Sequence, residues 1–468
     1  MTERAAKDSR IRSGEPREQD LQGQCVALRG EILTFLADPE HPNGDLNPDA
    51  WQHWSDGLVI CRNGRIEAIG PADQLLSRLE ADCALHDVRP GLILPGFIDT
   101  HIHFPQVDVM ASYGETLLRW LSQYTFPAEL RLADPAIARE TADFFLQELL
   151  RHGTTSAVVY GSVHAHSVQA FFEASDALNT RMICGKVLMD RHAPDGLRDT
   201  VEQGERETRK LIETWQGRGR QQVVITPRFA VTSTPEQLRS AGNLLREYPD
   251  VYLQTHLAEN RQEIETVRSL FPEAQDYVDV YDRHGLLSPR SIFAHGIHLS
   301  DRERERLSQS GSQVAFCPTS NLFLGCGLLD LAGLEAAGVT TSIATDVGAG
   351  TSFSLLQTLA EAYKVTHLQH QRFSPVKAFY RITLGNAKSL GLEAQIGSLA
   401  VGSEADLVVL DPEATPLLAR RMQRCQSLQE RLFAWMMLGD DRAISSTWVA
   451  GRCLHRRSAE PRKKEPTA

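Results

Sequence analysis

The sequence predicts an α/β protein: a (β/α)8 TIM-like barrel with a small β-sandwich domain formed by the N- and C-terminal segments. Three observations favour this fold. Eight short apolar segments alternate with helical patterns through the middle of the chain. Segments rich in strand-forming residues and turn signals lie on both sides of that region. Several predicted strands end in histidine or aspartate, where barrels carry their active sites.

The N-terminal part comprises two predicted regions. Residues 1–24 are polar and charged, so we expect a flexible N-terminus without the apolar core of a secretory signal. Residues 25–92 form the first part of the β-sandwich domain. Within them, GLVICRNGRIEAIG has two apolar runs around Asn63 and Gly64, a pair of residues that favours a tight hairpin turn.

The barrel is predicted over residues 93–395, with its first strand beginning at the boundary. Helical patterns lie between most of the strands, as in residues 138–153 and 167–178, where apolar residues recur at spacings of three and four. The candidate strands are 92–103, 155–161, 181–190, 221–230, 251–259, 291–296, 313–318 and 340–346.

A pattern of short predicted strands occurs again near the C-terminus. Residues 396–456 are predicted to be the second part of the β-sandwich, because GSEADLVVLDP and STWVAGRCLH are short strands with glycine at the turns. Residues 457–468 are expected to form a flexible tail.

Composition excludes some functions. The net charge is −11, so bulk charge gives no support for a nucleic-acid partner. No apolar run is long enough to cross a membrane. The eight cysteines include no Cys-x-x-Cys pair, and in a chain of this length we interpret them as reduced, buried thiols of a cytoplasmic protein.

Two histidines end the first predicted barrel strand. His101 and His103 are two residues apart, so their side chains point to the same face of the strand, which in a barrel is the interior. Later strands end at His256, His295 and Asp346. Imidazole and carboxylate together suit a borderline divalent ion such as zinc. The pattern predicts a metal site inside the barrel mouth.

Other histidines are weaker candidates. His164 and His166 also have one residue between them, but they follow the second strand at the start of a helix and are interpreted as solvated. His152 follows a helix whose C-terminus it can complement, and His367 and His370 are expected at the surface. The fourth strand ends without a lysine that could bridge two metals, since the nearest is Lys186 on the third strand. One metal ion is therefore favoured.

At these residues the sequence resembles the amidohydrolase superfamily and, within it, the guanine deaminases. The superfamily signals are PGFIDTHIH, the histidines of the fifth and sixth strands, and the aspartate of the eighth. The narrower signals are HIHFPQ, LLRWLSQYTFPAE, GKVLMDR, PRF, THLAEN, FCPTSN and ATDVGAG. The resemblance extends from about residue 25 to residue 456.

The resemblance implies that one zinc ion is held by His101, His103, His256 and Asp346. Zinc would activate a water molecule for attack on C2 of guanine, giving xanthine and ammonia as in purine catabolism. Asp346 would accept the proton of that water, and His295 would stabilise charge in the intermediate. Glu259 would be the proton shuttle to the ring and to the leaving amine.

The resemblance also implies which residues read the substrate. Arg228 would donate to the carbonyl oxygen of guanine, a position where adenine carries an amine. Gln106 would contact a second edge of the ring, and Phe229 would pack on the ring or in the core. Trp120 and Phe126 either line the pocket or pack between helices.

Other functions stay open at this point. One is a deaminase or chlorohydrolase of another heterocycle, which Arg228 and the TFPAE segment disfavour. Another, from a different class, is a non-catalytic scaffold relative, although such relatives lose metal ligands that this chain keeps. The expected partners are guanine and a second copy of the chain in a homodimer, with no nucleic acid and no membrane.

Overall fold

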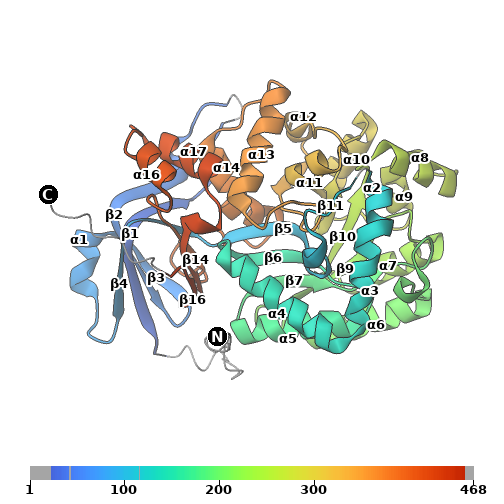
Figure 1. The fold of residues 1–468 in the computed structure, drawn as a ribbon, viewed down its shortest axis with the longest axis horizontal. Coiled ribbons are helices and arrows are strands. Elements are labelled where there is room, and N and C mark those ends of the chain that lie inside the picture. The colour runs from blue at the N-terminus through green and yellow to red at the C-terminus, as the bar shows by residue number, and fades with distance from the viewer. Residues whose placement is uncertain (1–22, 42–43, 115, 459–468) are drawn as a thin grey trace, which may run out of the picture.

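The structure is a computed structural model that describes residues 23–41, 44–114 and 116–458. Figure 1 shows a barrel of strands and helices on one side and a separate sheet on the other. The predicted flexible ends, 1–24 and 457–468, fall outside the described residues except at their inner two positions. None of the helices in the described ranges combines the length and apolar character that crossing a membrane requires.

The predicted barrel is confirmed. Its strands run parallel in the order β5-β6-β7-β9-β10-β11-β12-β13, and β8 pairs with β9. The sheet closes where the amide of Asp346 donates to the carbonyl of His101 at 2.9 Å and the amide of His103 donates to Val347 at 2.7 Å. The strands are β5 (Phe97–His103), β6 (Thr154–Tyr160), β7 (Arg181–Gly185), β8 (Val187–Leu188), β9 (Gln222–Pro227), β10 (Tyr252–Leu257), β11 (Ser291–His295), β12 (Gln313–Phe316) and β13 (Thr340–Ile343).

The segment 92–103, predicted as one strand, is divided between two sheets. Its first residues belong to β4 (Ala84–Pro95) of the terminal sheet, and the barrel strand begins at Phe97. Gly96 stands between them, and a Cβ there would lie 2.2 Å from the Thr155 hydroxyl oxygen. A continuous apolar run cannot show this change of sheet, because both halves are buried.

Helices surround the barrel and confirm the two helical patterns singled out in the sequence. Around the barrel they are α4 (Pro135–Arg151), α5 (Ala165–Leu178), α6 (Val201–Trp215), α7 (Pro235–Glu247), α8 (Arg261–Leu270), α9 (Tyr277–Arg283), α10 (Asp301–Ser310), α11 (Pro318–Phe323), α12 (Leu331–Ala336) and α13 (Leu355–Leu368). The others are α1 (Ala72–Leu75), α2 (Leu117–Trp120), α3 (Phe126–Leu130), α14 (Pro375–Tyr380), α15 (Asn386–Ser389), α16 (Pro416–Met422) and α17 (Leu428–Leu438).

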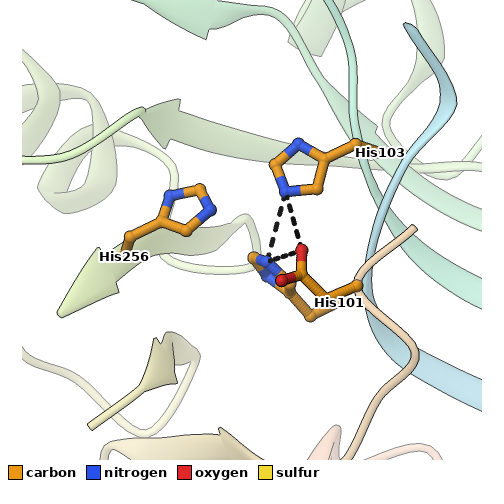
Figure 2. A group of neighbouring side chains, drawn as sticks. His101, His103 and His256 are labelled. Atoms are coloured by element: carbon orange, nitrogen blue, oxygen red, sulfur yellow. Dashed lines mark hydrogen bonds and ion pairs between the residues drawn. The ribbon is translucent and has the colours of Figure 1, made fainter. Parts of the chain in front are cut away.

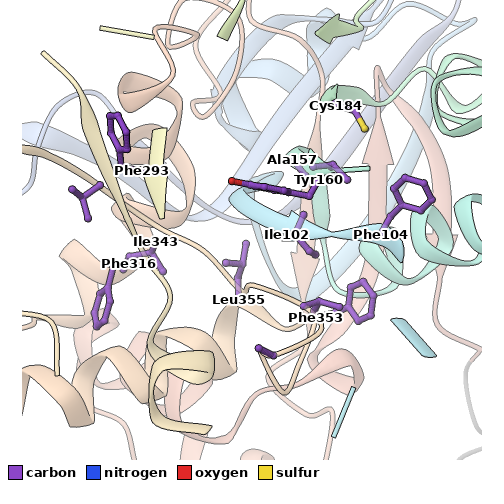
Figure 3. Packing of buried hydrophobic residues seen from close by; sticks show 14 of the residues in the cluster. Ile102, Phe104, Ala157, Tyr160, Cys184, Phe293, Phe316, Ile343, Phe353 and Leu355 are labelled. Carbon is purple, nitrogen blue, oxygen red and sulfur yellow. The ribbon is translucent and has the colours of Figure 1, made fainter. Parts of the chain in front are cut away.

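Alternation along β5 separates core from site. Ile102 and Phe104 point outward into the apolar layer under the helices (Figure 3), where Phe104 stacks on Phe171 of α5 at 5.2 Å between ring centroids. The neighbouring histidines consequently face the barrel interior. Below them the interior is apolar, with one residue from each strand region: Ile98, Val158, Ile183, Val224, Tyr252, Ile292, Ala315 and Ala344. The histidines therefore lie above an apolar layer of the barrel interior.

The two ends of the chain form a second sheet, as predicted. Its seven strands have the order β16-β15-β14-β4-β1-β2-β3, and the Asn63–Gly64 turn joins β2 to β3. Leu28, Val59, Leu407 and Trp448 pack together in its core. The strands besides β4 are β1 (Cys25–Phe35), β2 (Trp51–Arg62), β3 (Arg65–Pro71), β14 (Leu407–Leu410), β15 (Ile444–Val449) and β16 (Arg452–Arg456). Helices α16 and α17, between β14 and β15, were not predicted.

The prediction that all cysteines are reduced, buried thiols is wrong. Cys25 and Cys83 form a disulfide, with their Cα atoms 4.5 Å apart, and Cys425 and Cys453 are only partly buried. The pairing joins the start of β1 to the turn before β4, two strands that lie next to each other in the sheet. Because 58 residues separate the two cysteines, the sequence gives no local sign of the contact.

A buried ionic cluster joins the barrel to the terminal sheet. The guanidinium of Arg220 donates to Asp406 and Glu404, which lie just before β14, and to the carbonyl of Asn179 at 2.7 Å. Arg181 donates to both oxygens of Glu404, from Nε to Oε2 at 3.0 Å and from Nη2 to Oε1. Removing one partner of a buried pair leaves an uncompensated charge, which is costly.

Arg220→Ala is therefore expected to lower the free energy of unfolding by about 3 kcal/mol. Arg268→Ala is the control, because that arginine pairs with Glu265 at the surface and should change stability by less than about 0.5 kcal/mol. Urea denaturation followed by circular dichroism measures both. Equal midpoints for the two variants would contradict a stabilising role of the buried cluster.

Candidate functional site

Three imidazoles and one carboxylate meet at the barrel mouth (Figure 2). The Nε2 atoms of His101 and His103 are 3.3 Å apart, and the Asp346 Oδ1 atom lies 3.1 Å from the first and 3.3 Å from the second. His256, at the end of β10, completes the group, whose potential ligand atoms all lie within 4.8 Å of one another. The four residues brought together are those that the family resemblance implied.

The donor set of this cluster fits a divalent metal ion. His256 contacts the carbonyl oxygen of Arg228 through Nδ1 at 2.7 Å, so its Nε2 atom is left to accept. Burial lowers the pKa of His256 well below its usual value and that of His103 to about 4, so both rings are neutral with a lone pair available. Neutral imidazoles and a carboxylate are the ligands that zinc takes in catalytic sites.

The backbone at three of these strand ends is unusual. Ala258, His295 and Asp346 have positive φ angles of 47°, 74° and 53°, although none is glycine. Such conformations are costly for L-residues and concentrate at functional sites. Here they turn the chain sharply after β10, β11 and β13 and direct polar side chains toward the mouth.

Glu259 and His295 lie beside the metal cluster. The Glu259 Oε2 atom is 3.4 Å from the His295 Nε2 atom, and its Oε1 atom accepts from the Cys326 thiol at 3.2 Å. The other ring nitrogen of His295 lies 2.9 Å from the side-chain amide nitrogen of Asn321. Burial, followed by the charges of Asp346 and a nearby glutamate, raises the pKa of Glu259 well above its usual value. This carboxyl group is thus suited to carrying a proton at neutral pH.

Glu263 fixes the loop that carries Glu259. Its Oε2 atom accepts from the backbone amides of Glu259 and Asn260 at 3.0 and 3.1 Å, as part of the capping box of α8. The Tyr277 hydroxyl donates to its other oxygen at 2.7 Å. The backbone of Glu259, three residues after His256, is therefore held at the start of α8, while its carboxylate side chain faces the site.

A cavity opens onto the cluster. Arg228, Phe229 and Gln106, the three predicted substrate contacts, all line it. Trp120 lines the wall as well. Phe126 packs against the Arg228 guanidinium, with 5.4 Å between the centroid of its ring and the Cζ atom of Arg228. Both aromatic residues whose location was left open therefore belong to the surroundings of the pocket.

Sequence reasoning did not single out Glu129. This carboxylate of α3 is 1% exposed and accepts from the Arg228 Nη1 atom with both oxygens, each at 2.8 Å. It also accepts from the amide nitrogen of Gln106 at 3.0 Å. The signal was present, since Glu129 ends the motif LLRWLSQYTFPAE, but nothing in the motif shows what this residue contacts.

The other candidates stay outside the site. His164 caps the start of α5, and His166 contacts the carbonyl of Leu132 through Nε2 at 2.8 Å. His152 contacts a carbonyl at the end of α4, and Lys186 is buried in an ion pair with Asp199. His367 and His370 are exposed. None of these side chains belongs to the metal-ligand groups found among the described residues.

The amidohydrolase family model matches residues 92–454, which include every element of the barrel and most of β14 to β16. The chain belongs to the amidohydrolase family. The motifs that suggested this family are the ones that form the mouth of the barrel, so the sequence prediction is confirmed.

Relatives of this amidohydrolase include the guanine deaminase of Escherichia coli (strain K12), which is 47% identical over 92% of this chain and 98% of its own length. The solved structure of E. coli guanine deaminase superposes on this structure with a TM-score of 0.89, and the match covers 92% of this chain and 100% of the other. A probable guanine deaminase of Deinococcus radiodurans is 42% identical over 88% of this chain and 96% of its own. A guanine deaminase from C. acetobutylicum, solved with bound guanine in the active site, is 26% identical with a TM-score of 0.80, covering 92% and 100% of the two chains.

Proposed function

We propose that this chain is a guanine deaminase, which hydrolyses guanine to xanthine and ammonia in purine catabolism. The observation that carries the proposal is a single cavity. Three of the four metal-ligand residues line it, together with the buried carboxyl group of Glu259 and the buried guanidinium of Arg228. Relatives that share 47% and 42% identity over nearly their whole length carry this name, which supports the same substrate.

The metal ion is proposed to be zinc, one per chain, held by His101, His103, His256 and Asp346. When bound, a divalent ion at this position lowers the pKa of a water molecule toward neutrality. The remaining steps are carried out by Asp346, Glu259 and His295, whose side chains line the cavity.

Proton movement follows from three residues. Asp346 accepts the proton of the water that attacks C2 of the purine. Glu259 gives its proton to the ring nitrogen next to C2, regains one from the hydroxyl now bound to C2, and passes it to the amine. The C2–N bond then breaks, the C2 oxygen becomes a carbonyl, and neutral ammonia leaves. The proton held by Asp346 returns to Glu259 and restores the starting state. His295, held by Asn321 and 3.4 Å from Glu259, donates to the oxygen on which negative charge develops.

Substrate recognition is proposed to depend on Arg228, which donates to the carbonyl oxygen of guanine. Phe229 is proposed to pack beside the guanine ring. Its own ring lies 6.4 Å from that of His256, measured between centroids. Gln106 has a narrower role than expected, because its amide nitrogen already contacts Glu129 and His103, at 3.0 and 3.1 Å. Its contribution to the substrate is therefore proposed to come from its carbonyl oxygen.

The alternatives are weakened by the same geometry. A deaminase of a ring without an oxo group would have no use for a guanidinium at the wall of the cavity. A non-catalytic scaffold has no need to keep four ligands within 4.8 Å of one another beside a buried carboxyl group. The homodimer stays a prediction drawn from the resemblance, and the cytoplasmic location stays a prediction drawn from the cysteine pattern.

The test is a product assay on purified protein of known metal content. Guanine, adenine, cytosine and ammeline are incubated separately, and ammonia and the ultraviolet spectrum are followed. We expect xanthine from guanine alone, with about one zinc per chain. Metal-loaded protein that deaminates another ring and ignores guanine would overturn the substrate, and metal-free protein without any activity would favour the scaffold.

The contact between the Cys326 thiol and Glu259 can be tested by mutation. Cys326→Ala removes the thiol that donates to the Glu259 Oε1 atom, and we expect kcat to fall about tenfold because the carboxyl group loses one fixed contact. Cys326→Ser keeps a donor of similar size and should stay within about threefold of the parent. Steady-state kinetics measures both. Equal rates for the two variants would mean that this contact does not hold Glu259 for turnover.

A further inference from the structure

A second layer of the site lies behind the cavity wall. Arg228 and Gln106 line the cavity, whereas Glu129, which contacts both of them, is not among the lining residues. Glu129 comes from α3 and Arg228 from the end of β9, so their ion pair joins segments 99 residues apart. The two side chains are 1% and 3% exposed, so the pair is shielded from bulk solvent.

The arginine is constrained on two sides. Both carboxylate oxygens of Glu129 lie 2.8 Å from the same Nη1 atom, and the Phe126 ring packs against the guanidinium plane at 5.4 Å. A buried guanidinium without a counter-charge would be strongly unfavourable, so Glu129 neutralises it as well as orients it. The pocket therefore presents fixed N–H donors whose charge is already compensated, which suits a neutral ligand oxygen better than an anion.

Gln106 is fixed by the same carboxylate. Its amide nitrogen donates to the Glu129 Oε1 atom at 3.0 Å and lies 3.1 Å from the Nδ1 atom of His103, one of the clustered imidazoles. The backbone amide of Gly348 lies 3.4 Å from its carbonyl oxygen. Glu129 thus stands at the end of a continuous polar chain that passes through Gln106 to the metal cluster.

We propose that Glu129 is a positioning residue that makes the pocket selective for rings carrying an oxo group, by acting through Arg228 and Gln106. The inference deepens the proposed function and rests on it, because it assumes that Arg228 faces the oxo group of the substrate. Glu129 itself touches neither substrate nor metal. A merely structural carboxylate would leave ring preference unchanged when replaced by its amide.

The experiment compares two inhibitors of guanine turnover: hypoxanthine, which has the oxo group, and purine, which lacks it. Parent enzyme is expected to bind hypoxanthine about 100-fold more tightly. In Glu129→Gln this preference should be less than about fivefold. The kcat/KM for guanine should decrease about 100-fold, and the metal content should not change. Glu140→Gln, on the exposed side of α4, is the control and should behave as the parent.

A second measurement separates positioning from folding. In an Arg228→Met background, adding Glu129→Gln should lower kcat/KM by much less than the roughly 100-fold expected in the parent, because only the contact of Glu129 with Gln106 is left to lose. Glu129→Asp, which keeps the charge but cannot reach as far, should show the same loss of ring preference as the amide.

The outcomes are distinguishable. Unchanged preference in a folded, metal-loaded Glu129→Gln would overturn the inference and leave the deaminase proposal intact. A parent enzyme that ignores guanine would overturn the proposed function itself. If both Glu129 variants lost their metal and their thermal transition, Glu129 would be a folding residue, and the inference would be wrong.

Discussion

Replacing Glu259 by glutamine is expected to lower kcat about a thousandfold while the protein keeps its metal. The amide has nearly the same shape and can still accept from Cys326, but it cannot give up and regain a proton. Burial of the carboxyl group raises its pKa well above the usual value, which favours the protonated form that the first proton transfer needs.

The measurement is single-turnover deamination of guanine alongside metal analysis of the same preparation. Glu265→Gln is the matched control, since that glutamate lies on the exposed side of α8 and pairs with Arg268 at the surface. We expect the control to retain parental rates. A Glu259→Gln variant within about threefold of the parent would remove this residue from the proton path and leave Asp346 as the sole carrier.

The Glu259 result also separates binding from chemistry. Because its proton transfer takes place only during the reaction, loss of the carboxyl group should lower kcat and kcat/KM together and leave KM unchanged. The inferred role of Glu129 has the opposite character, since Arg228 is proposed to contact the ring both before and during the reaction. A Glu129 variant is therefore expected to show much of its effect in ligand binding.

The barrel could be predicted because its signals are local. A His-x-His pair at a strand end, and single ligands at later strand ends, need only the strand assignment and the rule that barrel sites lie at the carboxyl ends. The sequence alone therefore predicted that residues from four strand ends meet at the barrel mouth. The inward direction of His101 and His103 followed from the two-residue period of a strand.

Features that depend on distant contacts could not be predicted. Glu129 is 99 residues from Arg228, and the two cysteines of the disulfide are 58 residues apart. The change of sheet at Gly96 depends on the approach of Thr155, which no property of the apolar run reveals. The positive φ angles at His295 and Asp346 go against residue preference, and only the surrounding fold can impose them.

Removing the metal ion is expected to abolish deamination, and adding one equivalent of zinc should restore it. The His101→Ala variant should bind less than about one tenth of a zinc ion per chain, because the ligand set loses one of three imidazoles. The matched control changes the other His-x-His pair: a His164→Ala/His166→Ala double variant should keep about one zinc per chain, since neither histidine belongs to the cluster.

Metal removal should also be visible without any substrate. An ion that binds the folded chain alone stabilises it, by about 4 kcal/mol at a thousand times its dissociation constant. Apo protein should therefore unfold at lower urea concentration than zinc-loaded protein, and the His101→Ala variant should show no such difference. A zinc-dependent shift that survives in His101→Ala but is lost in the double variant would move the metal to the second histidine pair. Because the two pairs lie on different elements, β5 and the start of α5, this comparison decides between them independently of activity.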